Sequence, residues 1–216
     1  MFDPVADHDV ERFNRWAESY ERHPLQRLIL EPIQRTLLEV AASEVPQPRA
    51  ILDVGCGTGR LLRAAAEVFP EARLDGVDAA AEMVRVAQAT MPADARITFR
   101  LAGAEALPFG DGLFDLVFST MTFHHWTDQR AGIGEVARVL APDGRWLLAD
   151  FIASGLMKYV RRIFRLRRFP ERRDLLPMLA AAGLEVATER TVRGVGRQVP
   201  ILVIRPGHLA KAARRA

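Results

Sequence analysis

Several residue types and sequence features are scarce in this chain. Cys56 is the single cysteine among 216 residues, so no internal disulfide can form and a disulfide-built scaffold is excluded. No apolar run approaches the ~18 residues that a membrane-spanning helix needs. The first residues also lack the apolar core of a signal peptide. Together these absences lead us to expect a soluble, cytoplasmic protein.

Lysine is scarce too, because only Lys158 and Lys211 stand among the 30 basic residues and the rest are arginine. The net charge is +3, yet residues 158–173 hold eight basic residues and one acidic residue. That segment therefore carries +7 and the other 200 residues sum to −4. Arginine favours phosphates and carboxylates, but a genome-wide codon bias explains the same usage.

The composition is that of an ordinary globular domain, with 49% hydrophobic and 26% charged residues. Apolar runs at 50–54, 74–78, 97–101, 114–119 and 146–150 read as strands, and helical spacing at 60–69, 80–90 and 130–140 separates most of them. A helix at 172–182 leads to late strands at 184–192 and 199–204. Such alternation predicts an α/β fold: a single Rossmann-like, doubly wound, mostly parallel seven-stranded sheet with helices on both faces.

We divide this single domain into four parts. Residues 1–45 form an N-terminal helical cap or lid, and the Pro-rich join at 45–49 separates it from the core at 46–150. Residues 151–171 form a basic amphipathic insertion after the fifth strand. Residues 172–216 hold the C-terminal helix and the late strands.

A glycine-rich loop follows the first predicted strand, where parallel sheets bind their ligands. Gly55, Gly57 and Gly59 allow a tight turn and a close ligand approach. Asp53 precedes the loop, and Asp78 follows Gly59 by nineteen residues, at the end of the second strand. A dinucleotide fingerprint needs a third glycine where this chain has Arg60 or Leu62, so an adenosine ligand other than a dinucleotide is favoured.

On these motifs the chain resembles the class I S-adenosylmethionine-dependent methyltransferases, in their ubiquinone/menaquinone methyltransferase-like small-molecule branch (methyltransferase type 11). Residues 52–59 look like the first motif of that family, and Gly76-Val77-Asp78 look like its ribose-binding motif. Residues 104–109 with 114–117 resemble the adenine-contacting loop and the fourth strand. Residues 135–145 resemble the helix and turn before the fifth strand.

The resemblance implies S-adenosyl-L-methionine as cofactor and S-adenosyl-L-homocysteine as its product. Asp53 and the glycine loop are expected at the methionine part, Asp78 at the ribose, and Ala79 with Met83 on the adenine. The full set of expected cofactor-binding residues is Tyr20, Asp53, Gly55, Cys56, Gly57, Thr58, Gly59, Asp78, Ala79, Met83, Gly103, Ala104, Glu105, Ser119 and Thr120. No metal is expected, because Asp128 and Asp150 are isolated from other carboxylates.

Some of these residues have a second interpretation. Asp53 could cap the first helix of the core, and Met83 could be plain core. Trp16 and Tyr20 could pack one helix face on the core instead of covering the cofactor. Gly103 departs from the family, which usually has an acidic residue there, so the backbone of Ala104 is left to contact the adenine.

His124 and His125 are the candidate catalytic residues, since they follow the fourth strand on the ligand side. A histidine could take a proton from a phenol, carboxylate or amine during methyl transfer. The same residues could merely line the pocket, and the sequence does not distinguish the two.

We therefore expect a methyltransferase that acts by direct in-line displacement on an O, N or C atom of a small, partly apolar molecule. Nucleic acid is an unlikely partner because the loop after strand four lacks the motif of base-methylating enzymes, although the arginine patch keeps an RNA methyltransferase open. A non-catalytic S-adenosylmethionine-binding protein is the other alternative. Residues 156–168 form a basic amphipathic helix that could gate the pocket, contact a membrane surface peripherally or be plain structure. The sequence leaves the oligomeric state open.

Overall fold

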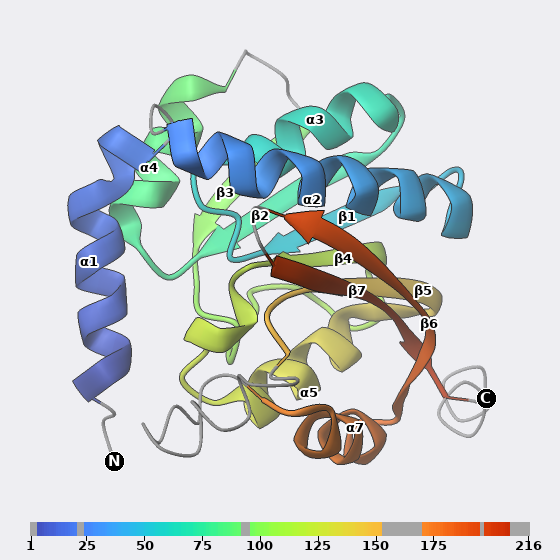
Figure 1. The fold of residues 1–216 in the computed structure, drawn as a ribbon. Coiled ribbons are helices and arrows are strands. Elements are labelled where there is room, and N and C mark those ends of the chain that lie inside the picture. Colours follow the sequence, from blue (N-terminus) through green and yellow to red (C-terminus); the bar gives the residue numbers. More distant parts are fainter. Residues whose placement is uncertain (1–3, 21–23, 92–95, 153–169, 195–196, 208–216) are drawn as a thin grey trace.

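The computed structural model describes residues 4–20, 24–91, 96–152, 170–194 and 197–207. Seven strands form one sheet in the order β3-β2-β1-β4-β5-β7-β6 (Figure 1). The five strands from β3 to β5 pair in parallel, and β7 pairs antiparallel with both β5 and β6. The predicted fold class, a mostly parallel seven-stranded sheet, is confirmed.

The element bounds follow the chain order. The strands are β1 (Ala50–Val54), β2 (Arg73–Asp78), β3 (Ile97–Leu101), β4 (Phe114–Thr120), β5 (Leu140–Ala149), β6 (Leu184–Gly194) and β7 (Arg197–Pro206). The helices are α1 (Pro4–Tyr20), α2 (Pro24–Glu44), α3 (Arg60–Val68), α4 (Ala81–Thr90), the short 3-10 helix η1 (Phe123–His125), α5 (Gln129–Val139) and α7 (Arg172–Ala181).

Helices cover both faces of the sheet because the central strands are buried on both sides. All five residues of β1 are buried, as a strand between two helical layers requires. One core layer packs α2, α3 and α4 on the sheet, and the other packs α5 and α7 on the opposite face (Figure 1). A third, small cluster joins α1 to α4 through Ala17, Met83 and Val86. Helix α1 therefore stands at the margin of the sheet, beside α4.

The order of the strands reverses between β1 and β4. From β1 the chain continues outward to β2 and β3, and from β4 it continues the other way to β5. Ligands of open α/β sheets bind beyond the carboxyl ends of the strands at this reversal. In this chain that region holds the loops after β1, β2 and β4.

The structure differs from the sequence prediction in one detail. The turn expected before the fifth strand, at 142–145, lies inside β5, where the register with β4 slips between Phe114 and Leu116. The N-terminal cap is helical, as predicted, and consists of α1 and α2. The predicted amphipathic helix at 156–168 lies outside the described residues. No helix of the described ranges is long and apolar enough to cross a membrane.

Candidate functional site

The loop after β1 turns on three glycines in the left-handed region. Gly55, Gly57 and Gly59 have φ angles of 78°, 54° and 79°. The amides of Gly55 and Cys56 both donate to the carbonyl of Val77, at 2.8 and 2.9 Å, which ties the loop to β2. A Cβ on Gly55 would lie 2.0 Å from Thr122 Oγ1. Glycine is therefore required here by both backbone conformation and space.

Asp78 joins the glycine loop to the start of α4. Its Oδ2 accepts a hydrogen bond from the amide of Gly57 at 2.8 Å, and its Oδ1 accepts one from Ala80 at 2.9 Å. Burial raises the pKa of Asp78, and these two hydrogen bonds oppose the rise. The carboxylate at the end of β2 is thus fixed in place before any ligand arrives.

Asp53 is a buried carboxyl group without a partner. Its side chain is 2% exposed, and Oδ1 has no hydrogen-bond partner among the described residues. Burial, together with the nearby charge of Asp78, raises the pKa of Asp53 to about 8. The cap of α3 is Gly59, and no side chain caps that helix end. The interpretation of Asp53 as a helix cap is therefore wrong, and its position suits a cationic group of a ligand.

Two adjoining pockets surround these carboxyl groups. The larger is a cleft of about 800 Å³, counted to its open mouth, between α1, α4 and the ends of β1, β2 and β4. The smaller lies beneath the glycine loop, where Asp53, Cys56 and Thr58 meet Gln34 of α2 and Arg60 of α3. Tyr20, Gly55, Gly57 and Thr120 line both pockets. The shared walls make the two pockets one elongated site.

The structure gathers most of the predicted cofactor-binding residues around this site. The lining of the two pockets includes Tyr20, Asp53, Gly55, Cys56, Gly57, Thr58, Asp78, Ala79, Met83, Gly103, Ala104, Glu105 and Thr120. Met83 also packs in the small core cluster between α1 and α4, so its core role is confirmed, and its contact with the adenine stays a prediction.

Two predicted residues lie outside both linings. Ser119 is fully buried and accepts a hydrogen bond from Trp146 Nε1 at 3.1 Å, because neighbouring residues of a strand point to opposite faces. Thr120 faces the pockets instead, so we leave Ser119 out of the proposed site. Gly59 is the N-cap residue of α3, and its left-handed backbone forms the last part of the glycine loop.

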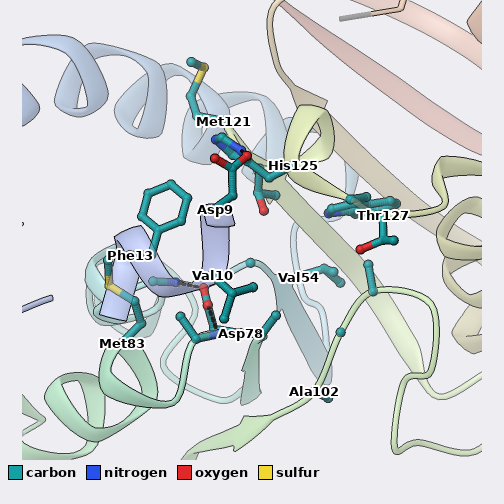
Figure 2. Close-up of a pocket in the computed structure, with 18 of the residues that line it drawn as sticks. Asp9, Val10, Phe13, Val54, Asp78, Met83, Ala102, Met121, His125 and Thr127 are labelled. Atoms are coloured by element: carbon teal, nitrogen blue, oxygen red, sulfur yellow. Dashed lines mark hydrogen bonds and ion pairs between the residues drawn. The ribbon is translucent and has the colours of Figure 1, made fainter. Parts of the chain in front are cut away.

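The two histidines occupy different environments. His125 lines the larger pocket, and its Nδ1 lies 2.7 Å from Oδ2 of Asp9 (Figure 2). His124 is outside the pocket lining, with Nδ1 2.6 Å from Oδ1 of the buried Asp150. Of the two predicted catalytic residues, the structure therefore brings only His125 to the site.

Sequence reasoning missed several residues of the lining. Asp9, Val10 and Phe13 of α1 enter the larger pocket, as do Thr122 and Trp126 beyond β4. The spacing of Phe13, Trp16 and Tyr20 indicated one helix face packed on the core, but Trp16 is 49% exposed and only Phe13 and Tyr20 pack there. Nothing in the sequence connects Asp9 with a histidine 116 residues away.

The backbone beyond β4 is itself unusual. Met121 adopts φ 56°, a left-handed conformation that side chains rarely take, and its amide donates to the carbonyl of Ala149 at 2.7 Å. This turn brings Thr122 against Gly55. Such strained positions are typical of functional sites.

Metal ligands are not gathered in the part of the chain that the structure describes. No group of three His, Cys, Asp or Glu side chains there could hold a metal ion. The charged side chains of the two pocket linings are Asp9, Asp53, Asp78, Glu105 and Arg60.

Known proteins are similar to this chain in sequence and in fold. A family model described as a methyltransferase domain matches residues 51–144. A malonyl-[acyl-carrier protein] O-methyltransferase of Geobacter sulfurreducens is 36% identical over 71% of this chain and 56% of its own. A demethylmenaquinone methyltransferase of Thermus thermophilus is 34% identical over 68% of this chain and 80% of its own. This chain belongs to the S-adenosylmethionine-dependent methyltransferases.

A solved methyltransferase shows the same fold. The 1,6-didemethyltoxoflavin-N1-methyltransferase of Burkholderia thailandensis, crystallised with S-adenosylhomocysteine, superposes with a TM-score of 0.69 at 19% identity, over 96% of this chain and 92% of its own. The chain spans about half the length of the first curated relatives it matches, between 51% and 56%.

The cofactor of this family is S-adenosylmethionine, and the site fits it in charge and shape. An unpartnered buried carboxyl group at Asp53 suits the ammonium group of its methionine part. A fixed carboxylate at Asp78, beside an open glycine loop, suits its ribose hydroxyls.

Proposed function

We propose that this chain binds S-adenosylmethionine along the two adjoining pockets and transfers its methyl group to an O, N or C atom of a small, partly apolar molecule. The observation that carries this proposal is the pair of carboxyl groups, Asp53 and Asp78, on either side of the left-handed glycine loop. One carboxyl group lines each pocket, and in this proposal they bind the two polar parts of one ligand, the methionine ammonium and the ribose. The family membership of the chain supports the same cofactor.

The smaller pocket takes the methionine part in this proposal. Asp53 binds the ammonium group, which supplies the positive partner that its buried carboxyl lacks. Arg60 and Gln34 line the same pocket and offer a cation and an amide to the methionine carboxylate. Sequence reasoning had assigned neither residue.

The larger pocket takes the adenosine. Asp78 receives the ribose hydroxyls, while Ala79 and Met83 contact the adenine. At Gly103 an added Cβ would lie 2.9 Å from Oε2 of Glu105, so the missing side chain leaves room for the adjacent carboxylate. The backbone at Gly103 and Ala104, together with Glu105, then recognises the adenine.

Methyl transfer depends more on the alignment of the acceptor atom with the methyl group than on acid–base chemistry at the cofactor. The sulfonium methyl is already activated, and the acceptor atom attacks it in line as the carbon–sulfur bond breaks. Holding the two reactants in that geometry is worth up to roughly 7–11 kcal/mol of the barrier. The half-enclosed pocket under α1 provides this alignment and keeps water away from the reacting atoms.

The acceptor end of the site combines apolar and polar side chains. Phe13 and Met121 line it, together with Asp9, Thr122 and His125. Figure 2 shows Asp9 and His125 together there, whereas Val10 lies next to Asp78. A small molecule with an apolar body and one polar atom fits such a lining. One relative, the demethylmenaquinone methyltransferase, is named for an organic small-molecule acceptor.

Binding of the cofactor is tested with Asp78→Ala by titration calorimetry. The affinity for S-adenosylmethionine is expected to fall by about 1–3 kcal/mol, because charge-assisted hydrogen bonds to the ribose are lost. Asp111→Ala is the control, since that carboxylate is exposed and pairs with Arg138 outside both pockets. An unchanged affinity in Asp78→Ala, or tighter binding of NAD than of S-adenosylmethionine, would contradict the proposal.

The two alternatives predict different results with the same protein. A nucleic-acid methyltransferase should retard RNA or DNA in a gel at ~100 mM salt, where phosphate-driven affinity still shows. A non-catalytic binding protein should bind the cofactor yet release no labelled methyl to any member of an acceptor panel. Methyl transfer to a small molecule without nucleic-acid binding supports the proposed function.

A further inference from the structure

His125 is held from helix α1 at the acceptor end of the pocket. Its Nδ1 lies 2.7 Å from Oδ2 of Asp9, and its ring meets the ring of Phe13 edge-on at 5.0 Å between centroids. Figure 2 shows Asp9 and His125 together at one end of the pocket and Asp78 towards the other. A carboxylate from the N-terminal helix thus reaches a histidine beyond β4.

Neighbouring groups fix this pair from both sides. Asp9 is 7% exposed, and its other oxygen, Oδ1, pairs with Arg12 Nη2 at 2.9 Å. On the far side, the ring of His124 lies 4.0 Å from that of His125 and is itself held by Asp150. The charged and titratable groups around His125 are therefore Asp9 and Arg12 of α1, His124 of η1 and Asp150 after β5.

The contact with Asp9 decides which ring nitrogen of His125 carries the proton. An ionised carboxylate only accepts hydrogen bonds, so Nδ1 must donate. In the neutral ring Nε2 then bears the lone pair, and Nε2 has no hydrogen-bond partner among the described residues. Burial and the adjacent His124 lower the pKa of His125 to about 4, against the opposing effect of Asp9. The ring is accordingly neutral near pH 7, with Nε2 able to accept a proton.

We infer that Asp9 positions His125 as the proton acceptor of the methyl transfer, and that the acceptor substrate is a neutral molecule whose hydroxyl or N–H group must lose a proton as it is methylated. This inference rests on the proposed function and narrows it. Family membership alone implies neither the positioning role of Asp9 nor an acceptor that carries a proton.

The step balances without a further reactant. A lone pair on the acceptor oxygen or nitrogen forms the bond to the methyl carbon, and the carbon–sulfur bond breaks with its electron pair going to sulfur. The acceptor's proton passes to Nε2 of His125. The imidazolium that forms is stabilised by the carboxylate of Asp9, and its proton leaves to solvent after product release.

A carboxylate acceptor fits this arrangement less well. It has already lost its proton, so it gains nothing from a base. It would also bring a second negative charge towards Asp9 in a half-buried site, where like charges repel strongly. The pair therefore favours alcohols, phenols and amines over carboxylic acids.

The protonation state of His125 can be measured without any substrate. Two-bond proton–nitrogen NMR spectra assign its ring, with His125→Gln identifying the signal. We expect the Nδ1–H form in the wild type. In Asp9→Asn the side-chain amide can donate to Nδ1, which shifts the ring towards the Nε2–H form. Asp9→Glu retains a carboxylate and should keep the wild-type pattern, and Glu11→Gln is the control for loss of a charge from α1.

Activity supplies the second readout, using labelled S-adenosylmethionine and a panel of phenols, alcohols, amines and carboxylic acids. We expect transfer to the first three groups, with kcat lowered roughly 10²–10⁴-fold in His125→Gln and on the order of 10–10²-fold in Asp9→Asn. Asp9→Glu should recover part of that loss. The dissociation constant for the cofactor should stay within about twofold in all three variants, since proton transfer is not part of cofactor binding.

The outcomes separate this inference from the proposed function. An Nε2–H ring in the wild type, carboxylic acids as the best acceptors, or an unchanged kcat in Asp9→Asn overturns the inference and leaves methyl transfer standing. Failure of the wild type to bind S-adenosylmethionine removes the proposed function instead, and the NMR result then still decides whether Asp9 orients His125.

Discussion

The two ends of the site are built in different ways. At the cofactor end, the glycine loop and the carboxylates of Asp53 and Asp78 come from one stretch of 26 residues, and backbone amides make the main contacts. At the acceptor end, side chains from α1, from the turn after β4 and from the end of β5 meet across the chain. The Asp9–His125 contact there spans 116 residues.

This difference follows from what each end must recognise. The cofactor is the same molecule throughout the family, so a backbone loop with fixed φ angles can serve it whatever the acceptor is. The acceptor differs among relatives, and side chains on separate elements can vary independently. Substitutions should therefore act on affinity at one end and on turnover at the other.

The largest effect on cofactor affinity is expected for Gly55→Ala at the cofactor end. A Cβ there would overlap Thr122 at 2.0 Å and would also place a side chain at φ 78°. The left-handed conformation alone costs roughly 1–2 kcal/mol, and relieving the overlap must move the loop. We expect cofactor affinity to fall more than about 100-fold in calorimetric titrations, since each 1.4 kcal/mol is about tenfold.

Gly112→Ala is the matched control for that substitution. Gly112 has φ 64°, and a Cβ there would meet nothing within 4 Å. It should lose the same backbone free energy of about 1–2 kcal/mol in stability while keeping its cofactor affinity. If both variants lost affinity equally, backbone strain and not the contact with Thr122 would explain the effect.

The same contrast sets how much could be predicted from the sequence. The strand–helix alternation, the glycine loop and Asp78 were readable because local spacing determines them. The mostly parallel seven-stranded sheet and most of the residues that line the two pockets followed from these motifs and from the family resemblance. Thr120 was correctly placed at the pocket, whereas Ser119 beside it was not, because side-chain direction depends on the pleat of β4.

The contacts at the acceptor end could not be predicted from the sequence, for a physical reason. His124 and His125 are identical neighbours in the sequence, and only the tertiary structure assigns one to Asp150 and the other to Asp9. At the cofactor end, too, Arg60 and Gln34 enter the smaller pocket only through the packing of α3 and α2. Contacts between distant elements leave no periodic signal in the chain.

The second effect is that of Asp53→Asn, which should raise the stability of the free protein and weaken the binding of the cofactor. An unfolded Asp ionises near pH 4, whereas the folded Asp53 has a pKa of about 8. The stability that this protonated group contributes is complete below pH 4 and is lost as the pH rises to about 8. Asp53→Asn does not titrate, so the Tm of the free variant should rise relative to the wild type between pH 4 and 8.

Cofactor binding by Asp53→Asn should weaken by about 1.5–3 kcal/mol, because a charged partner of the ammonium is lost. Binding to the wild type at pH 6.5 should also release close to one proton, since the ammonium favours the ionised carboxylate. Calorimetry in buffers of different ionisation enthalpy measures this release. Binding without proton release at pH 6.5 would show that Asp53 is already ionised in the free protein.

The smallest effect belongs to Asp150, behind the acceptor end. Its Oδ2 accepts from the amide of His124 at 3.1 Å, and its Oδ1 contacts His124 Nδ1 and the amide of Phe151, each at 2.6 Å. Asp150→Asn retains the shape but weakens these buried hydrogen bonds, which should cost about 1–3 kcal/mol. For a chain of this size each kcal/mol lowers Tm by roughly 2–4 °C.

Asp143→Asn, an exposed change within β5, the strand that precedes Asp150, is the control and should leave Tm unchanged. Because Asp150 lies outside both pocket linings, cofactor affinity should not change in Asp150→Asn. Its kcat should fall less than that of Asp9→Asn, since it acts on His125 only through the ring of His124. A larger loss of kcat in Asp150→Asn than in Asp9→Asn would place the proton-accepting group at His124 and reverse the roles of the two histidines.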